Sequence, residues 1–328
     1  MTSAHPYSRL EPALVLDALD TVGLRGDGRM LSLNSYENRV YQIYLEDGLI
    51  VVTKFYRPER WTDEEIGEEH AFARELAGRE IPVVAPMTLA GRTLHRHEGF
   101  RFAVYERRGG RPPALDKPEV LEWIGRFLGR IHVVGAVANF EHRPDLDPGT
   151  FGTDSRNWLL DHHFVPEDLR EAWTEIADRA LDAVEAAWES AGDFEAIRLH
   201  GDCHPGNILF VDGEGPHFVD LDDARMGPPV QDLWMLLSGD RASQSKQLKD
   251  VLAGYEQFRP FDRRELVLVE ALRTLRLLHY SAWIARRWHD PAFPAAFPWF
   301  GSTRYWQDRI LELREQVAAM EEPPLDPK

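Results

Sequence analysis

The sequence lacks disulfide-forming cysteines, long apolar runs and an excess of positive charge. Its one cysteine, Cys203, cannot form an intramolecular disulfide, which fits a reducing compartment. No run of about 18 apolar residues is present, which excludes a membrane-spanning helix. The N-terminus also lacks the basic cluster and apolar core of a secretory signal. We therefore expect a cytoplasmic protein that binds no membrane.

The charge balance is strongly acidic. Among 328 residues, 38 are Lys or Arg and 55 are Asp or Glu, which gives a formal net charge of −17. This balance argues against a protein that binds nucleic acid. Any anionic ligand must therefore meet a locally positive site. The hydrophobic fraction of 43% is typical of a globular protein, and the length is enough for roughly two domains.

Apolar residues in the first third of the chain predict a sheet with two helices. The strands are expected within 31–56, on either side of a turn, and at 83–89 and 99–105. The helices are expected at 11–24 and 62–77. The second helix begins with Thr62 and Glu65 at the spacing of a capping box. A Gly- and Pro-rich connection follows at 107–113, so we predict a first lobe over residues 1–106.

The remaining residues, 107–328, are predicted to be mostly helical. Apolar residues recur at intervals of three and four over 119–133, 166–190 and 263–288. The stretches that look extended are 197–199, 208–211 and 217–221. The closing segment from Glu321 is expected to be a frayed tail. The predicted fold is therefore α+β, with an N-terminal antiparallel sheet lobe and a mostly helical C-terminal lobe.

A polar loop between the extended stretches carries candidate chemistry. It reads His-Gly-Asp-Cys-His-Pro-Gly-Asn over residues 200–207, and Asp220 follows on the next predicted strand. Phosphoryl transfer needs a carboxylate that takes the proton of the acceptor and oxygen ligands that hold Mg²⁺. The spacing from Asp202 to Asn207 matches that of a protein-kinase catalytic loop. A hairpin between Asn207 and Asp220 would bring both oxygens to one Mg²⁺, a metal that takes few protein ligands.

A lysine at the end of a predicted strand supplies a candidate positive site. Lys54 closes the run Val-Val-Thr-Lys, as the lysine of the kinase V-A-I-K element does. The next helix offers Glu68 and Glu69 as partners, and placement favours Glu69. Such an ion pair would hold the ammonium toward nucleotide phosphates. The turn over 33–39 lies where a phosphate-covering loop belongs but has no glycine, so contact would rely on Ser35, Asn side chains and backbone amides.

These motifs together resemble the aminoglycoside phosphotransferase and choline kinase branch of the kinase superfamily. Six longer blocks, between about residues 31 and 300, are similar to bacterial stress response kinases of this branch. The blocks are LNSYENRVYQ, KFYRPERW, HGDCHPGNILF, FVDLDDAR, GPPVQDLWMLL and RRWHDPAFPAAFPW. The resemblance implies a two-lobed protein-kinase-like fold, ATP and Mg²⁺ dependence, and transfer of the γ-phosphate to serine or threonine of proteins. It also implies a cytoplasmic monomer that acts in stress responses.

The resemblance also implies roles for individual residues. Asp202 would be the proton acceptor, and Asp220 the second catalytic carboxylate. Asn207 and Asp220 would hold Mg²⁺, and Ser35 would contact ATP. Residues 1–106 would then be a nucleotide-binding lobe, and residues 107–328 a catalytic and acceptor-binding lobe.

The sequence departs from the eukaryotic kinase pattern. It contains no G-x-G-x-x-G, D-F-G or A-P-E motif, and eleven residues separate Asp220 from Asp232. This leaves no room for a long phosphorylatable activation loop. Asp232 is expected to accept hydrogen bonds from the catalytic-loop backbone, and His132 and His200 are expected to pack inside the protein. Cys203 is expected to be inert.

Three other functions stay open. A small-molecule kinase of the aminoglycoside, choline or sugar kinase type is possible, because spacing does not decode the C-terminal helices that hold the acceptor. A metal-dependent hydrolase would use His200, Asp202, His204, Asp220 and Asp222. That reading leaves Lys54 and Asn207 unexplained. The last is a nucleotide-binding scaffold without turnover.

Two residue roles also stay open. Asp222 is a candidate second metal ligand. The helix around Arg273, Arg276, Tyr280 and Trp283 could line an acceptor site, although core packing is the more common use of its apolar stripe.

Overall fold

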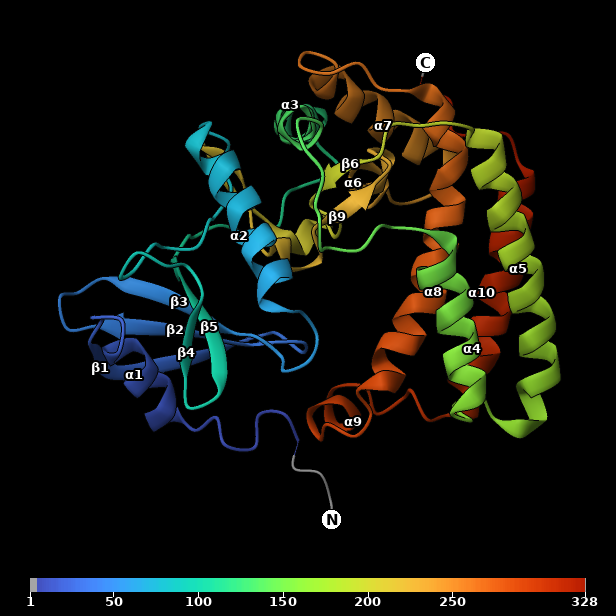
Figure 1. Cartoon of the computed structure of the whole chain (residues 1–328). Helices are drawn as coiled ribbons and strands as arrows, with labels where there is room; N and C mark the ends of the chain where they lie inside the picture. The colour runs from blue at the N-terminus through green and yellow to red at the C-terminus, as the bar shows by residue number, and fades with distance from the viewer. Residues whose placement is uncertain (1–4, 328) are drawn as a thin grey trace. The chain divides into compact units, whose positions relative to one another are not determined.

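The computed structural model describes residues 5–327, which divide into two units. The first unit contains the described residues up to Ala114, together with Phe140–Arg143 and His204–Ala224. The second contains Leu115–Asn139, Pro144–Cys203 and the described residues from Arg225 onward. An antiparallel sheet organises the first unit and helices make up most of the second (Figure 1). The predicted α+β fold class is therefore confirmed.

The sheet of the first unit has five antiparallel strands in the order β1-β2-β3-β5-β4. They are β1 (Gly26–Leu33), β2 (Arg39–Leu45), β3 (Ile50–Phe55), β4 (His95–His97) and β5 (Phe100–Glu106). The central strand β3 pairs with β2 on one side and β5 on the other, so that Lys54 lies opposite Val40 and Ala103. Because successive side chains alternate between faces, Phe55 and Lys54 lie on opposite sides of the sheet.

A helix covers each face of this sheet (Figure 1). Helix α1 (Pro12–Asp20) packs on the Phe55 face. Helix α2 (Asp63–Gly78) packs Ile66 on the opposite face, which is the face of Lys54. The predicted capping box of α2 is confirmed, because the Thr62 hydroxyl accepts the Glu65 N–H and the Glu65 carboxylate accepts the Thr62 N–H. The capping box fixes where α2 starts on the Lys54 face of the sheet.

Two parts of the predicted sheet differ from the structure. The sequence did not predict β1, because most of its residues are exposed and show no apolar alternation. The strand predicted over 83–89 is wrong, since Val83 and Pro86 form single bridges to Phe218 and Tyr105 instead of a ladder. Proline has no N–H to donate, so the two prolines of this stretch, Pro82 and Pro86, interrupt strand pairing.

A hairpin from the middle of the chain joins the first unit. It consists of β7 (Ile208–Val211) and β8 (Gly215–Phe218). The Phe218 N–H donates to the Pro82 carbonyl at 2.7 Å, and Arg111 and Phe210 exchange two backbone hydrogen bonds. These bonds explain why the first unit continues past residue 106, where the first lobe was predicted to end, and includes His204–Ala224.

Helices make up most of the second unit. They are α3 (Pro118–Gly135), α4 (Asp154–Asp161), α5 (Arg170–Ala191), α6 (Val230–Trp234), α7 (Arg241–Tyr255), α8 (Leu268–Arg286), α9 (Ala292–Ala296) and α10 (Thr303–Glu321). One core joins α4, α5, α8 and α10, with Trp173 and Trp306 edge to face at 5.9 Å between ring centroids. The strands β6 (Ile197–Leu199) and β9 (Arg225–Gly227) pair within this unit. The predicted mostly helical second half is therefore confirmed.

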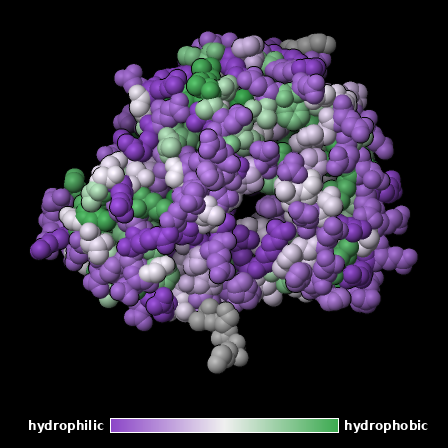
Figure 2. Space-filling view, viewed as in Figure 1, coloured by the Kyte–Doolittle hydropathy of each residue, from purple (hydrophilic) through white to green (hydrophobic). Residues whose placement is uncertain are grey.

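Polar side chains dominate the visible surface. The face seen in Figure 2 is mostly hydrophilic. Large hydrophobic side chains that are exposed, such as Leu49, Phe258 and Leu311, come from the turn before β3, the segment after α7 and helix α10, which are far apart in the sequence. Over residues 5–327, no helix joins the length and the apolar character that crossing a bilayer requires.

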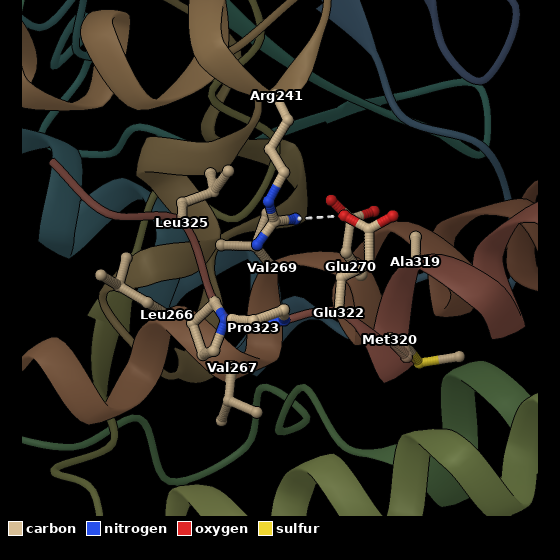
Figure 3. A pocket seen from close by; sticks show the side chains of 11 residues that line it. Arg241, Leu266, Val267, Val269, Glu270, Ala319, Met320, Glu322, Pro323 and Leu325 are labelled. Atoms are coloured by element: carbon tan, nitrogen blue, oxygen red, sulfur yellow. Dashed lines mark ion pairs between the residues drawn. The ribbon is translucent and has the colours of Figure 1, made fainter.

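The C-terminal segment, predicted to be a frayed tail, is mostly exposed but is anchored at one buried residue. Leu325 is 5% exposed and lines a small pocket with Leu266 and Val269 (Figure 3). Glu322 forms an ion pair with Arg241 at 3.4 Å. Burying a leucine side chain stabilises by roughly 1.5–3 kcal/mol. That gain offsets part of the entropy cost of ordering the segment, a cost that Pro323 and Pro324 reduce.

Glu265 should make stability depend on pH. The residue is 2% exposed, and its carboxylate accepts the N–H of Val230, the first residue of α6, at 2.8 Å. Burial raises its pKa to about 7 from 4.5. Between these values the folded state binds more protons than the unfolded state, so the free energy of unfolding falls as pH rises.

The Glu265→Gln variant should remove this dependence. The difference in free energy of unfolding between pH 5 and pH 8 should shrink by on the order of 3 kcal/mol. Urea unfolding of both proteins at both pH values measures it. An equal pH dependence in the variant would assign the effect to another group.

Candidate functional site

Lys54 lies in a buried cluster of charges within the first unit. Its ammonium is 3.0 Å from Asp220 Oδ1, 2.7 Å from Asp222 Oδ1 and 3.5 Å from Glu69 Oε1. The side chains of Lys54, Glu69 and Asp222 are buried, whereas that of Asp220 is 52% exposed. Strand β3, helix α2 and the segment after β8 therefore meet at one ammonium, and one carboxylate of the cluster remains open to solvent.

Burial and charge act against each other in this cluster. Burial by itself would lower the pKa of Lys54, but the three carboxylates hold it well above its ordinary value. Burial raises the pKa of Glu69 to about 7, although Lys54 opposes this. Burial would also raise the pKa of Asp222, but Arg60 and Lys54 outweigh it and lower that pKa to about 2. At neutral pH the cluster therefore contains a charged lysine and an ionised Asp222.

Arg60 is a member of the cluster that sequence reasoning missed. Its guanidinium pairs with Asp222 and lies 2.8 Å from Asp223 Oδ1, and its side chain is 11% exposed. Asp222 is thus shared by Arg60 and Lys54 in the ion-pair network, and its role as a second metal ligand stays a prediction. Arg60 and Asp222 are 162 residues apart in the chain, and no spacing rule connects them. The one signal was that Arg60 lies in the block KFYRPERW.

The hairpin β7–β8 places Asn207 beside Asp220. The Val219 N–H donates to the Asn207 carbonyl at 3.0 Å, so the residue before Asp220 is hydrogen-bonded to Asn207. Asp220 has a φ of 60°. This left-handed conformation costs about 1–3 kcal/mol in a residue other than glycine, and strained residues of this kind cluster at functional sites.

The oxygens at this position fit the predicted metal. Asp220 is a half-exposed carboxylate, and Asn207, whose side chain carries an amide oxygen, is hydrogen-bonded through its backbone to the residue before Asp220. Mg²⁺ binds in this way, with one or two protein oxygens and with water and nucleotide phosphates as its other ligands. The residues present could therefore hold Mg²⁺ together with a nucleotide.

The turn predicted to cover phosphates is anchored at one end. The Arg57 N–H donates to Asn38 Oδ1 at 3.1 Å, and Arg57 Nε donates to the Glu37 carbonyl at 3.1 Å. Ser35 lies in the same turn and is partly exposed. Its contact with ATP stays a prediction.

Glu68 and Glu69 have different partners. Glu69 faces Lys54, as described above, whereas the Glu68 carboxylate accepts the backbone N–H groups of three successive residues, Glu141, His142 and Arg143. Glu68 therefore attaches the segment Phe140–Arg143 to α2, and Glu69 is the glutamate of this helix that contacts the lysine.

Asp202 lies in the second unit, in the loop after β6. The Asp232 carboxylate accepts the backbone N–H groups of His200 and Gly201, both at 2.9 Å. His132 Nε2 is 3.0 Å from the same carboxylate. Gly201 has a φ of 84°, which favours glycine. The predictions that Asp232 supports the loop and that His132 and His200 are buried are confirmed.

Asp202 itself pairs with an arginine of α8. Arg276 Nη1 is 2.7 Å from Asp202 Oδ1, and 45% of the Arg276 side chain is exposed. The same helix buries Leu272 and Leu275, so its apolar stripe packs in the core as predicted while Arg276 reaches the loop that contains Asp202.

Cys203, the residue after Asp202, is buried, and burial raises the pKa of its thiol well above the ordinary value. A protonated, buried thiol is unreactive.

The predicted site residues thus fall into two groups. Lys54, Glu69 and Asp220 meet in the first unit, with Asn207 beside Asp220. Asp202 belongs to the second unit, and the boundary between the units lies after Cys203. The catalytic and ligand roles of these residues stay predictions.

Comparison with known proteins gives consistent matches. Residues 31–269 match the model of the phosphotransferase enzyme family. Stress response kinase A of Escherichia coli (strain K12) is 47% identical over 323 residues, which cover 98% of this chain and 97% of the relative. Serine/threonine protein kinase RdoA of Salmonella typhimurium (strain LT2) is 45% identical with the same coverage. Among solved structures, amicoumacin kinase hAmiN in complex with AMP-PNP and Ca²⁺ shares the fold, with a TM-score of 0.73, 18% identity, and coverage of 96% of this chain and 95% of that one.

Proposed function

Because the chain belongs to the phosphotransferase enzyme family, as its motifs predicted, we propose that it is an ATP-dependent serine/threonine protein kinase of the bacterial stress response. The observation that carries the proposal is the contact of Lys54 with both Glu69 and Asp220. Kinases hold nucleotide phosphates and metal with this set of groups. The protein acceptor is supported by the name of the Salmonella relative, and the stress response by that of the Escherichia coli relative.

The proposed reaction gives each predicted site residue a role. The acceptor oxygen forms a bond to the γ-phosphorus of ATP, the bond from that phosphorus to the bridging oxygen of ADP breaks, and Asp202 takes the hydroxyl proton. Lys54 would bind the phosphates by charge, and Ser35 would contact them from its turn. Asn207 and Asp220 would hold Mg²⁺, which when bound neutralises charge on the phosphates.

A small-molecule kinase is the second candidate. It is favoured by the fold shared with amicoumacin kinase, which belongs to that functional class by name. The two candidates differ in the acceptor and agree in the use of ATP.

Labelled ATP separates these candidates. The purified chain is incubated with γ-labelled ATP, Mg²⁺, casein, and a pool of amino alcohols, sugars and aminoglycosides. We expect label on serine or threonine of the protein, and none when Mg²⁺ is removed. Label confined to the small-molecule pool would replace the protein kinase by the second candidate, and product released without any nucleotide would overturn both.

A further inference from the structure

We infer that the acceptor site prefers hydroxyl groups flanked by negative charge, and that Arg276 sets this preference. The inference deepens the proposed function and rests on it, because it takes Asp202 as the base. It concerns the choice among acceptors, which neither the motifs nor the fold specify.

Arg276 is placed where an acceptor would meet the base. Its Nη1 contacts Asp202 Oδ1 at 2.7 Å, and the side chain is 45% exposed. Over residues 5–327, its other hydrogen-bond contact is from the same nitrogen to the Met235 sulfur at 3.9 Å. A guanidinium has five N–H donors. Donors on Nε and Nη2 therefore remain available to a ligand that approaches Asp202.

A neighbouring arginine on α8 shows the contrast. Arg273 directs Nη1 to both oxygens of Glu270 at 2.8 Å, and Nη2 to Gln244 at 3.1 Å. Its side chain is 23% exposed. Arg273 is thus neutralised inside the protein, whereas Arg276 has the proposed base as its ionic partner.

The charge of the Asp202–Arg276 pair changes during the reaction. Before transfer, carboxylate and guanidinium sum to zero. Once Asp202 has taken the hydroxyl proton, the pair carries one positive charge. A carboxylate or phosphate close to the acceptor hydroxyl compensates this charge, while an ammonium repels it. The effect grows toward the transition state, so it should appear in turnover as well as in binding.

The preferred acceptor is therefore a serine or threonine flanked by Asp, Glu or a phosphorylated residue. Amino alcohols and aminoglycosides carry ammonium groups, which the positive charge of the pair would repel. The net charge of −17 by itself would attract basic peptides. A preference for acidic peptides would therefore have to come from the site itself.

Matched peptides test the inference. Two peptides of equal length each contain a single serine, which is flanked by Glu in the acidic peptide and by Lys in the basic peptide. For each peptide, kcat and KM are measured at about 0.15 M salt, where distant charges are screened. We expect the wild type to prefer the acidic peptide by roughly three- to tenfold in kcat/KM, as for a half-exposed charge. Arg276→Lys should keep most of the preference and Arg276→Glu should reverse it.

Arg304→Glu is the matched control. Arg304 lies on α10, its side chain is 89% exposed, and the substitution makes the same change in net charge. It should keep the wild-type preference. Arg276→Gln is a second variant, expected to abolish the preference without a new negative charge, and thermal unfolding of each protein verifies that it is folded.

The outcomes are distinct. Phosphorylation of both peptides with a preference for the basic one, or a preference that Arg276→Glu and Arg276→Gln leave unchanged, overturns the inference and leaves the proposed kinase function intact. Transfer to an ammonium-bearing small molecule and to neither peptide overturns both.

Discussion

Replacing Asp202 by Asn is expected to lower turnover by about 10²- to 10⁴-fold, because an amide cannot take the acceptor proton. The fold should persist, since Asp232 holds the loop through the backbone of His200 and Gly201. ATP binding should persist as well, because Lys54 and Asp220 belong to the other unit. Transfer from γ-labelled ATP measures turnover, and titration with a fluorescent ATP analogue measures binding.

Asp212→Asn is the matched control for this variant. Asp212 lies in the turn between β7 and β8, its side chain is 74% exposed, and it pairs with the exposed Arg111. The substitution removes the same charge and should change turnover by no more than a few-fold. Wild-type turnover in Asp202→Asn would remove Asp202 from the role of base. Loss of ATP binding in that variant would instead point to a structural role.

Replacing Lys54 by Met should abolish ATP-dependent transfer and also destabilise the protein by about 3–5 kcal/mol. Methionine keeps much of the side-chain length but leaves Glu69 and Asp222 buried without the ammonium. Asp222 keeps Arg60 as a partner, so the buried Glu69 accounts for most of the expected loss. Urea unfolding measures the free energy, and labelled ATP measures transfer.

A double variant separates the two effects. Glu69→Gln in the Lys54→Met background removes one stranded charge and should recover about 1–3 kcal/mol of the unfolding free energy, with no recovery of transfer. The single variant Glu69→Gln completes the cycle. If the free energy of unfolding of Lys54→Met equals that of the wild type, the cluster does not couple stability to the nucleotide site.

Local patterns explain what could be predicted from sequence. Strand alternation and the capping box of α2 depend on residues a few positions apart, which a sequence displays directly. The spacing of Asp202, Asn207 and the later Asp220 reflects a single loop and hairpin. Such short-range relations were enough to predict the main helices and strands and the residues of the candidate site.

Long-range pairing explains what could not be predicted. Arg60 pairs with Asp222 and Arg276 pairs with Asp202, and each partner is otherwise an ordinary charged residue in its own segment. Leu325 is a lone leucine among prolines and acidic residues, and its burial depends on a pocket formed by distant helices. Interactions of this kind form between segments that meet only in the folded chain, so no local sequence pattern predicts them.

The discontinuous first unit limits how this polypeptide can be dissected. A fragment that ends near Ala114 would retain Lys54 and lose Asp220 and Asp222, which belong to the inserted stretch His204–Ala224. The complementary fragment would carry that stretch without Pro82 and Arg111, to which its backbone is bonded. Chimeras between relatives must therefore exchange all three sequence stretches at once, and a single crossover point would separate charges that stabilise each other.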